Sequence, residues 1–199
     1  MLQALKISMI GKEFHILKDE EVWGIFKSGN EEALGFIYRS NISILYKYGN
    51  KFSSNGQLVE DCIQDLFLTI WKNRENLSAT NSIKLYLLGA LRKKLIRYAE
   101  KDLRHRQEHQ STEDYSFDLE YNPQELEFSI ESRMTNQKTV KLFLKKLSKR
   151  QREAIYLKFY QDMDYKEISQ VMELNYQSAR NLVYSSLSAL KTLLNRHLV

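Results

Sequence analysis

Apolar side chains recur at intervals of three and four residues along most of this chain, a spacing that predicts helices rather than strands. The pattern is clearest over residues 164–191, where Ile168, Val171 and Met172 fall on one face of a first helix. The run breaks at residues 174–175 and then resumes as a second helix. Two helices joined by a turn of a few residues are typical of a helix-turn-helix.

Polar residues mark where these helices begin. Asp164 stands just before the first helix and Glu167 follows three residues later, which is the spacing of a capping box. Asn175 is a suitable N-cap for the second helix, because its side chain can accept from an exposed amide of the first turn. Ser148 and Gln151 form another capping box, which predicts a further helix immediately upstream.

The second helix of this pair has an apolar and a polar face. The apolar positions, which we expect to point inward, are Ala179, Leu182, Val183, Leu187 and Leu190. The polar face offers Tyr176, Gln177, Ser178, Arg180, Asn181 and Tyr184. Such side chains can bond to base edges and phosphates in a major groove, so this face is a candidate DNA-binding surface. The alternative is an αα-hairpin in a helical bundle whose polar face is only solvated.

Helical pattern also fills the first half of the chain, including residues 19–26, 58–74 and 83–99. The stripe expected to be buried in the helix over 58–74 is Val59, Cys62, Ile63, Leu66, Phe67 and Ile70. The same helix carries an acidic, hydrogen-bonding patch with two aromatic residues nearby: Asp61, Gln64, Asp65, Phe67 and Trp71. An exposed Trp beside acids suggests a protein-contact surface. A solvated acidic face is the alternative.

The helix over 83–99 is strongly basic and follows a polar loop at 75–82. Its cations are Lys84, Arg92, Lys93, Lys94 and Arg97. So many cations on one helix repel one another unless a polyanion is near. Tyrosines such as Tyr86 alternate with these cations, and aromatic faces can hold unstacked bases while cations hold phosphates. We interpret this helix as a surface for single-stranded nucleic acid, against the alternative of an ordinary solvated helix.

The net charge of +5 hides an asymmetry along the chain. Residues 1–106 carry a net charge of +5 and residues 132–199 carry +8, whereas residues 107–131 hold eight acidic residues and no Lys or Arg. Residues 105–132 also break every helical period and contain the only Pro. This composition predicts a flexible acidic linker between two basic helical blocks that suit a polyanionic partner.

These patterns predict an all-α fold with two small helical domains joined by a flexible acidic linker, the C-terminal domain being a helix-turn-helix. The expected limits are an extension at 1–18, a first domain at 19–104, the linker at 105–132 and a second domain at 133–199.

Other features exclude several classes of protein. Cys62 is the only cysteine, so a disulfide framework is excluded and a reducing compartment is expected. The start of the chain is too short and too interrupted for a signal peptide, and no apolar run approaches a membrane span. We therefore expect a cytoplasmic protein. No phosphate-binding loop, nucleophile elbow or metal-ligand motif is found, so we expect no enzyme, no metal, no cofactor and no small-molecule substrate.

Three stretches resemble one family in the right order. LVEDCIQDLFLTIWKNRENL, at residues 58–77, looks like region 2.2 of bacterial sigma factors, and NSIKLYLLGALRKKLIRYAEK, at 81–101, looks like regions 2.3 and 2.4. The segment from Leu144 to Lys191 looks like region 4. The chain thus resembles the small, two-domain extracytoplasmic-function sigma factors. SARNLVYSSLSALK further resembles variants common in Bacteroidetes, some of them paired with membrane-bound anti-sigma regulators.

The resemblance implies a role for each domain. The first would be the sigma region 2 domain, binding core RNA polymerase through Asp61, Gln64, Asp65, Phe67 and Trp71. The same domain would hold the single-stranded minus-ten element of promoter DNA. Those residues would be Asn76, Ser78, Asn81, Lys84, Tyr86, Arg92, Lys93, Lys94 and Arg97. The second would be the region 4 domain, reading the minus-thirty-five element through Tyr176, Gln177, Ser178, Arg180, Asn181 and Tyr184. A membrane-bound anti-sigma factor is a further candidate partner.

Two departures from the family pattern fall in region 4. Many members have Gly in the turn between the two helices, where this chain has Glu173, and we expect the turn to close if no residue there needs a positive φ. Many members carry an Arg-Ala pair late in the recognition helix, where this chain has Ser185 and Ser186.

Two other functions compete with transcription initiation. A helix-turn-helix repressor or activator would bind duplex DNA without polymerase, but it leaves the Asp61–Trp71 patch unexplained. A helical adaptor without DNA function leaves the basic helix at 83–99 unexplained.

Overall fold

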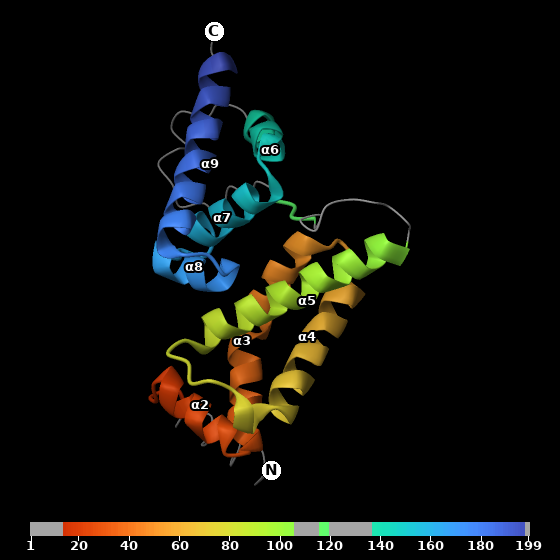
Figure 1. Ribbon diagram of the computed structural model, residues 1–199, viewed down its shortest axis with the longest axis vertical. Coiled ribbons are helices and arrows are strands. Elements are labelled where there is room, and N and C mark those ends of the chain that lie inside the picture. The colour runs from red at the N-terminus through yellow and green to blue at the C-terminus, as the bar shows by residue number, and fades with distance from the viewer. Residues whose placement is uncertain (1–13, 106–115, 120–136, 198–199) are drawn as a thin grey trace. The chain divides into compact units, whose positions relative to one another are not determined.

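The computed structural model describes residues 14–105, 116–119 and 137–197 of the chain, and these residues form helices and no strand. Figure 1 shows the helices in chain order. They are α2 (Asp19–Lys27), α3 (Glu31–Phe52), α4 (Gly56–Lys72), the 3₁₀ turn η1 (Arg74–Asn76), α5 (Ile83–His105), α6 (Gln137–Lys146), α7 (Lys149–Phe159), α8 (Tyr165–Met172) and α9 (Tyr176–His197). The predicted all-α fold is confirmed. None of the described helices is long and apolar enough to cross a membrane.

The contacts divide the chain into two compact units, residues 1–50 with 54–97 and residues 51–53 with 98–199. The domain and linker limits that we expected from the sequence are not tested by this division and stay predictions. Most of the predicted linker, and the extension up to residue 13, lie outside the described residues.

The core of the first unit is built on α4. Asn55 caps this helix by accepting from the amide of Leu58 at 3.3 Å. The predicted stripe Val59, Cys62, Ile63, Leu66, Phe67 and Ile70 is buried throughout. Burial raises the pKa of the Cys62 thiol, as expected for a small core residue without a charged role. The helix thus commits one side to the core and leaves the other side for contacts.

A close approach of α3 and α4 depends on Gly49. A Cβ at this position would overlap the Cγ1 of Val59, so the two helices can meet here only because Gly49 has no side chain.

The second unit contains the helix-turn-helix. Both predicted capping boxes are present: Ser148 with Gln151 at the start of α7 and Asp164 with Glu167 at the start of α8. Asn175 caps α9 by accepting from the amide of Ser178 at 2.7 Å. Helices α7 and α8 both pack against α9, and the predicted helix pair is therefore confirmed.

The turn between α8 and α9 requires a left-handed residue. Glu173 adopts φ 54°, ψ 49°, and its amide bonds back to the carbonyls of Ser169 and Gln170. The turn therefore closes without Gly, but the condition that we set for it is not met: Glu173 adopts a positive φ, the conformation for which Gly is favoured.

Within the predicted linker, Phe117 packs against α7. Phe117 and Leu119 are buried, and the Nε of Arg152 donates to the carbonyl of Phe117 at 2.7 Å. The Phe117 ring also meets Tyr156 edge-on, with ring centroids 5.8 Å apart. The acidic composition of the segment gave no sign that Phe117 would be buried against α7.

We expect Gly49→Ala to destabilise the first unit by about 1–3 kcal/mol, because the new methyl group overlaps Val59 in a packed core. Urea unfolding of purified variants measures this free energy. Gly24→Ala on α2 is the matched control, because a Cβ there meets nothing within 4 Å. The control should be neutral or stabilising, since Ala favours a helix over Gly by roughly 0.5–1 kcal/mol. Equal effects of the two changes would contradict the close approach.

We expect Glu173→Gly to stabilise the second unit by about 1 kcal/mol, since Gly adopts a positive φ without steric cost. Thermal unfolding of the two proteins checks this. Glu173→Ala removes the same side-chain atoms beyond Cβ but keeps the strain, and it should not raise the melting temperature. If the Ala variant gained as much stability as the Gly variant, backbone strain would not be the cause.

Candidate protein and nucleic-acid interfaces

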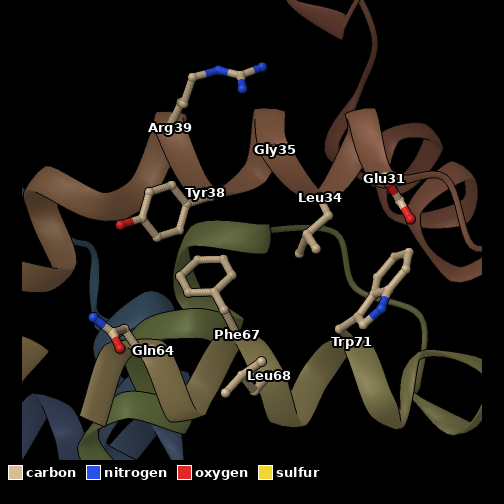
Figure 2. A pocket seen from close by; sticks show the side chains of 9 residues that line it. All are labelled: Glu31, Leu34, Gly35, Tyr38, Arg39, Gln64, Phe67, Leu68 and Trp71. Atoms are coloured by element: carbon tan, nitrogen blue, oxygen red, sulfur yellow. The ribbon is translucent and has the colours of Figure 1, made fainter. Parts of the chain in front are cut away.

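A groove of about 590 Å³ runs between α3 and α4. Figure 2 shows Leu34 and Tyr38 of α3 directed toward α4, whereas Arg39 is directed away from it. The lining residues that matter for its chemistry are Leu34, Tyr38, Gln64, Phe67, Leu68 and Trp71. Gln64, Phe67 and Trp71 were predicted from sequence as protein-contact residues, and the structure brings them together at this groove.

The groove is mainly apolar and partly open to solvent. Leu68 is 69% exposed and Tyr38 is 41% exposed. The Tyr38 ring meets Phe67 edge-on, with centroids 5.0 Å apart, so this exposed ring is held against the core. Exposed apolar side chains gathered at a groove mark a contact surface for a partner. Sequence reasoning missed Leu34, Tyr38 and Leu68, although the position of Leu68 three residues after Asp65 was a usable signal.

The two predicted acidic residues lie beside the groove and do not line it. Asp61, Gln64 and Leu68 share a face of α4 by their spacing of three and seven residues. Asp61 accepts from Gln57 Nε2 at 3.0 Å. Asp65 accepts from Lys94 Nζ of α5, which also donates to Thr69 Oγ1 at 3.2 Å. A predicted polymerase-binding carboxylate is therefore paired with a predicted DNA-binding ammonium.

The loop that follows η1, residues 77–82, is fixed by α2. Trp23 Nε1 donates to the carbonyl of Ser78 at 2.9 Å, and Lys27 Nζ donates to the carbonyl of Leu77. Asp19 Oδ2 accepts from the amide of Ile83 at 2.7 Å, where α5 begins. The three predicted base-binding residues, Asn76, Ser78 and Asn81, are all exposed.

The predicted cations of α5 are not on one surface. The spacing of seven and four residues places Tyr86, Lys93 and Arg97 on one face of the helix, and Lys93 and Arg97 are exposed. Tyr86 is half-buried against Trp23, with ring centroids 4.9 Å apart, and this burial raises the pKa of its phenol. Lys84 is half-buried.

Two further cations of α5 lie elsewhere. Arg92 is buried at 9% exposure, and Lys94 faces α4 through its ion pair with Asp65. The exposed basic face of α5 is therefore narrower than the sequence suggested.

The predicted face of α9 is open to solvent. Gln177, Arg180 and Asn181 are exposed, and Gln177 Nε2 donates to Asn181 Oδ1 at 2.9 Å. Tyr184 is 75% exposed and Tyr176 is 53% exposed, while Ser178 is half-buried at the capped first turn.

The apolar face of α9 is less buried than expected, and Leu182 and Leu190 are only half-buried. Ala179 and Val183 are buried as predicted, but Leu187 is 36% exposed and Ser186 is buried. Ser186 can occupy this place because its hydroxyl donates to the carbonyl of Leu182 at 2.6 Å, which satisfies its polar atom inside the helix.

Two models of protein families match the chain, one largely in its first half and one in its second half. The family model for Sigma-70 region 2 matches residues 37–105, and the model for Sigma-70, region 4 matches residues 138–190. No curated protein matches the chain significantly.

Several solved structures are similar to this chain, and two of them share its fold over most of its length. One is CnrH in complex with the cytosolic domain of CnrY, with 20% identity, TM-score 0.59, and coverage of 89% of this chain and 97% of that chain. The other is the sigma factor RpoE in complex with the anti-sigma factor NepR from Bartonella quintana, with 21% identity and TM-score 0.54, covering 83% of this chain and 96% of that chain.

The two family matches lie in the order region 2, then region 4, and together they take up more than half of the chain. The second match contains α8 and most of α9, and the groove of α3 and α4 falls largely inside the first. Members of this family bind core RNA polymerase and promoter DNA. The chain belongs to the sigma-70 family of transcription initiation factors.

Proposed function

We propose that this protein is an extracytoplasmic-function sigma factor that binds core RNA polymerase, recognises a promoter through two separate elements, and opens the DNA between them. The observation that carries the proposal is the apolar groove of the region 2 unit, in the same chain as an exposed recognition helix in the region 4 unit. A repressor acting alone has no use for such a groove.

The groove suits a helical partner with apolar and basic residues. Tyr38, Leu68 and Trp71 offer apolar contact, and Asp61 adds negative charge beside the groove, on the face of α4 that it shares with Leu68. Aromatic and apolar anchors surrounded by polar groups are the usual centre of a protein interface. We assign this surface to core polymerase.

The DNA-binding surfaces need only bind, without chemistry of their own. Exposed Lys93 and Arg97 would neutralise phosphates, and Asn76, Ser78 and Asn81 would receive an unstacked base of the minus-ten element. Gln177, Arg180 and Asn181 would meet base edges and phosphates of the minus-thirty-five element in a major groove. Opening of the duplex follows if separated strands are held more tightly than paired ones.

An anti-sigma factor is a further proposed partner. The similar RpoE structure contains the anti-sigma factor NepR, which supports the idea of such a regulator for this chain. A membrane-bound regulator, the likeness to Bacteroidetes variants and a cytoplasmic location stay predictions of the sequence.

Run-off transcription tests the proposed function. Purified protein is added to core RNA polymerase and a library of upstream DNA fragments, and new transcripts that require the protein are expected. Promoter fragments bound equally well without core polymerase would instead favour the helix-turn-helix repressor or activator. Binding to neither core polymerase nor DNA would favour an adaptor.

We expect Leu68→Lys to weaken binding to core polymerase by about tenfold or more, because it places a charge inside an apolar contact surface. Co-purification and titration with core polymerase measure the effect. Ile16→Lys is the matched control, since Ile16 is 83% exposed in the same unit and does not line the groove. Unchanged affinity of the Leu68 variant would remove the groove from the polymerase-binding surface.

A further inference from the structure

We propose that α2 is the positioning element of the 77–82 loop, with Asp19, Trp23 and Lys27 acting together as positioning residues for capture of an unstacked promoter base. This inference rests on the proposed function, because it concerns the minus-ten surface of the same protein. No role was assigned to α2 from sequence.

The three residues recur every four positions and so form one stripe along α2. Each makes a hydrogen bond to backbone at the loop. Lys27 and Trp23 donate to the carbonyls of Leu77 and Ser78 where the loop begins, and Asp19 accepts from the amide of Ile83 just after the loop ends. One face of one helix therefore holds both ends of the loop.

The helix that carries this stripe is itself firmly packed. Val22 and Trp23 are 1% exposed and Phe26 is fully buried. The Trp23 ring contacts Phe26 and Tyr86, in both cases with centroids 4.9 Å apart. Because a buried indole N–H needs an acceptor, the Ser78 carbonyl and the Trp23 ring fix each other's position.

The turn before the loop, η1, lies close to α2. The chain leaves α2 through Gly29 at φ 92°, and a Cβ on Gly29 would lie 3.4 Å from Arg74 Nε of η1. Arg74 also stacks over Trp71 at 4.7 Å and donates to its carbonyl at 3.0 Å. Arg74 thus ties η1 to the end of α4, while the stripe of α2 holds the loop that follows.

This arrangement separates the backbone of the loop from its side chains. The carbonyls of Leu77 and Ser78 are used to hold the loop, whereas Asn76, Ser78 and Asn81 remain exposed. A binding surface that is already ordered pays less conformational entropy when its ligand arrives. The α2 stripe would therefore strengthen base capture without touching the base.

Asp19→Ala is the main test, because Asp19 is exposed and its loss should leave the core intact. Asp19→Asn is the matched control, since its amide oxygen can still accept from Ile83. On the free protein, hydrogen exchange at the amide of Ile83 should become at least about tenfold faster in the Ala variant and should return toward wild type in the Asn variant.

The functional readout uses the complex with core polymerase and a forked DNA whose minus-ten strand is single-stranded, taken from a promoter found by run-off transcription. Asp19→Ala should weaken binding to this fork by about fivefold, while binding to core polymerase and to the minus-thirty-five duplex stays unchanged. Replacing the captured base by an abasic site should weaken fork binding by the wild-type protein more than fork binding by the variant. Trp23→Phe loses the N–H but keeps an aromatic ring, and it should behave like Asp19→Ala. Phe26→Leu alters the same core without touching the loop, and its fork binding should fall as much as that of wild type when the base is removed.

Three outcomes would overturn the inference, and they differ from one another. Fork binding by Asp19→Ala and Trp23→Phe equal to wild type would reject the positioning role and leave the proposed function intact. Equal losses of fork, duplex and core binding would show that the residues only stabilise the fold. A wild-type complex that fails to bind the fork would reject the proposed function, and this inference with it.

Discussion

The first unit depends on the burial of one apolar stripe of α4. The same helix must also expose the residues that are proposed to bind a partner. Its six buried residues occupy the side toward the core, so every remaining polar or apolar contact must come from the rest of its circumference. That remaining arc carries Gln64 and Leu68 toward the groove and Asp65 toward Lys94 of α5. Asp65 of α4 thus joins the helix assigned to polymerase to Lys94 of α5, a cation predicted to meet DNA. An exposed ion pair of this kind contributes little to stability, roughly 0–1 kcal/mol, and its interest lies in what it connects.

The periodic part of this structure could be predicted from sequence, because it depends on neighbours within one or two helical turns. The buried stripe of α4, the two capping boxes and the Asn175 cap are all local patterns. The exposed face of α9 followed from the same periodicity. Periodicity and charge also indicated a protein-contact patch and two nucleic-acid surfaces. Core polymerase and the two promoter elements, as the partners of these surfaces, came only from the family resemblance, and these roles remain proposals.

The parts that sequence could not supply are contacts between distant segments. Tyr38 joins the groove because α3 packs on α4, and Asp65 meets Lys94 across a separation of 29 residues. The acidic composition around Phe117 masked an aromatic residue that is fully buried against α7. Glu173 shows a different limit, since a residue that disfavours positive φ is held there by the hydrogen bonds of the surrounding turn. Residue type gives the preferred backbone conformation and degree of burial, whereas contacts between distant segments determine the conformation and burial that the residue adopts.

The two tryptophans of the chain lie at the two places where the region 2 unit is proposed to act. Trp71 is half-buried at the groove, and Trp23 is buried beside the 77–82 loop with its N–H on a loop carbonyl. The native protein therefore contains two intrinsic fluorophores, each in contact with one proposed binding surface. Emission from Trp71 should respond to a protein partner that fills the groove, and emission from Trp23 should respond to a change at the loop. A change at either surface could then be followed through intrinsic fluorescence in real time, without attaching a dye.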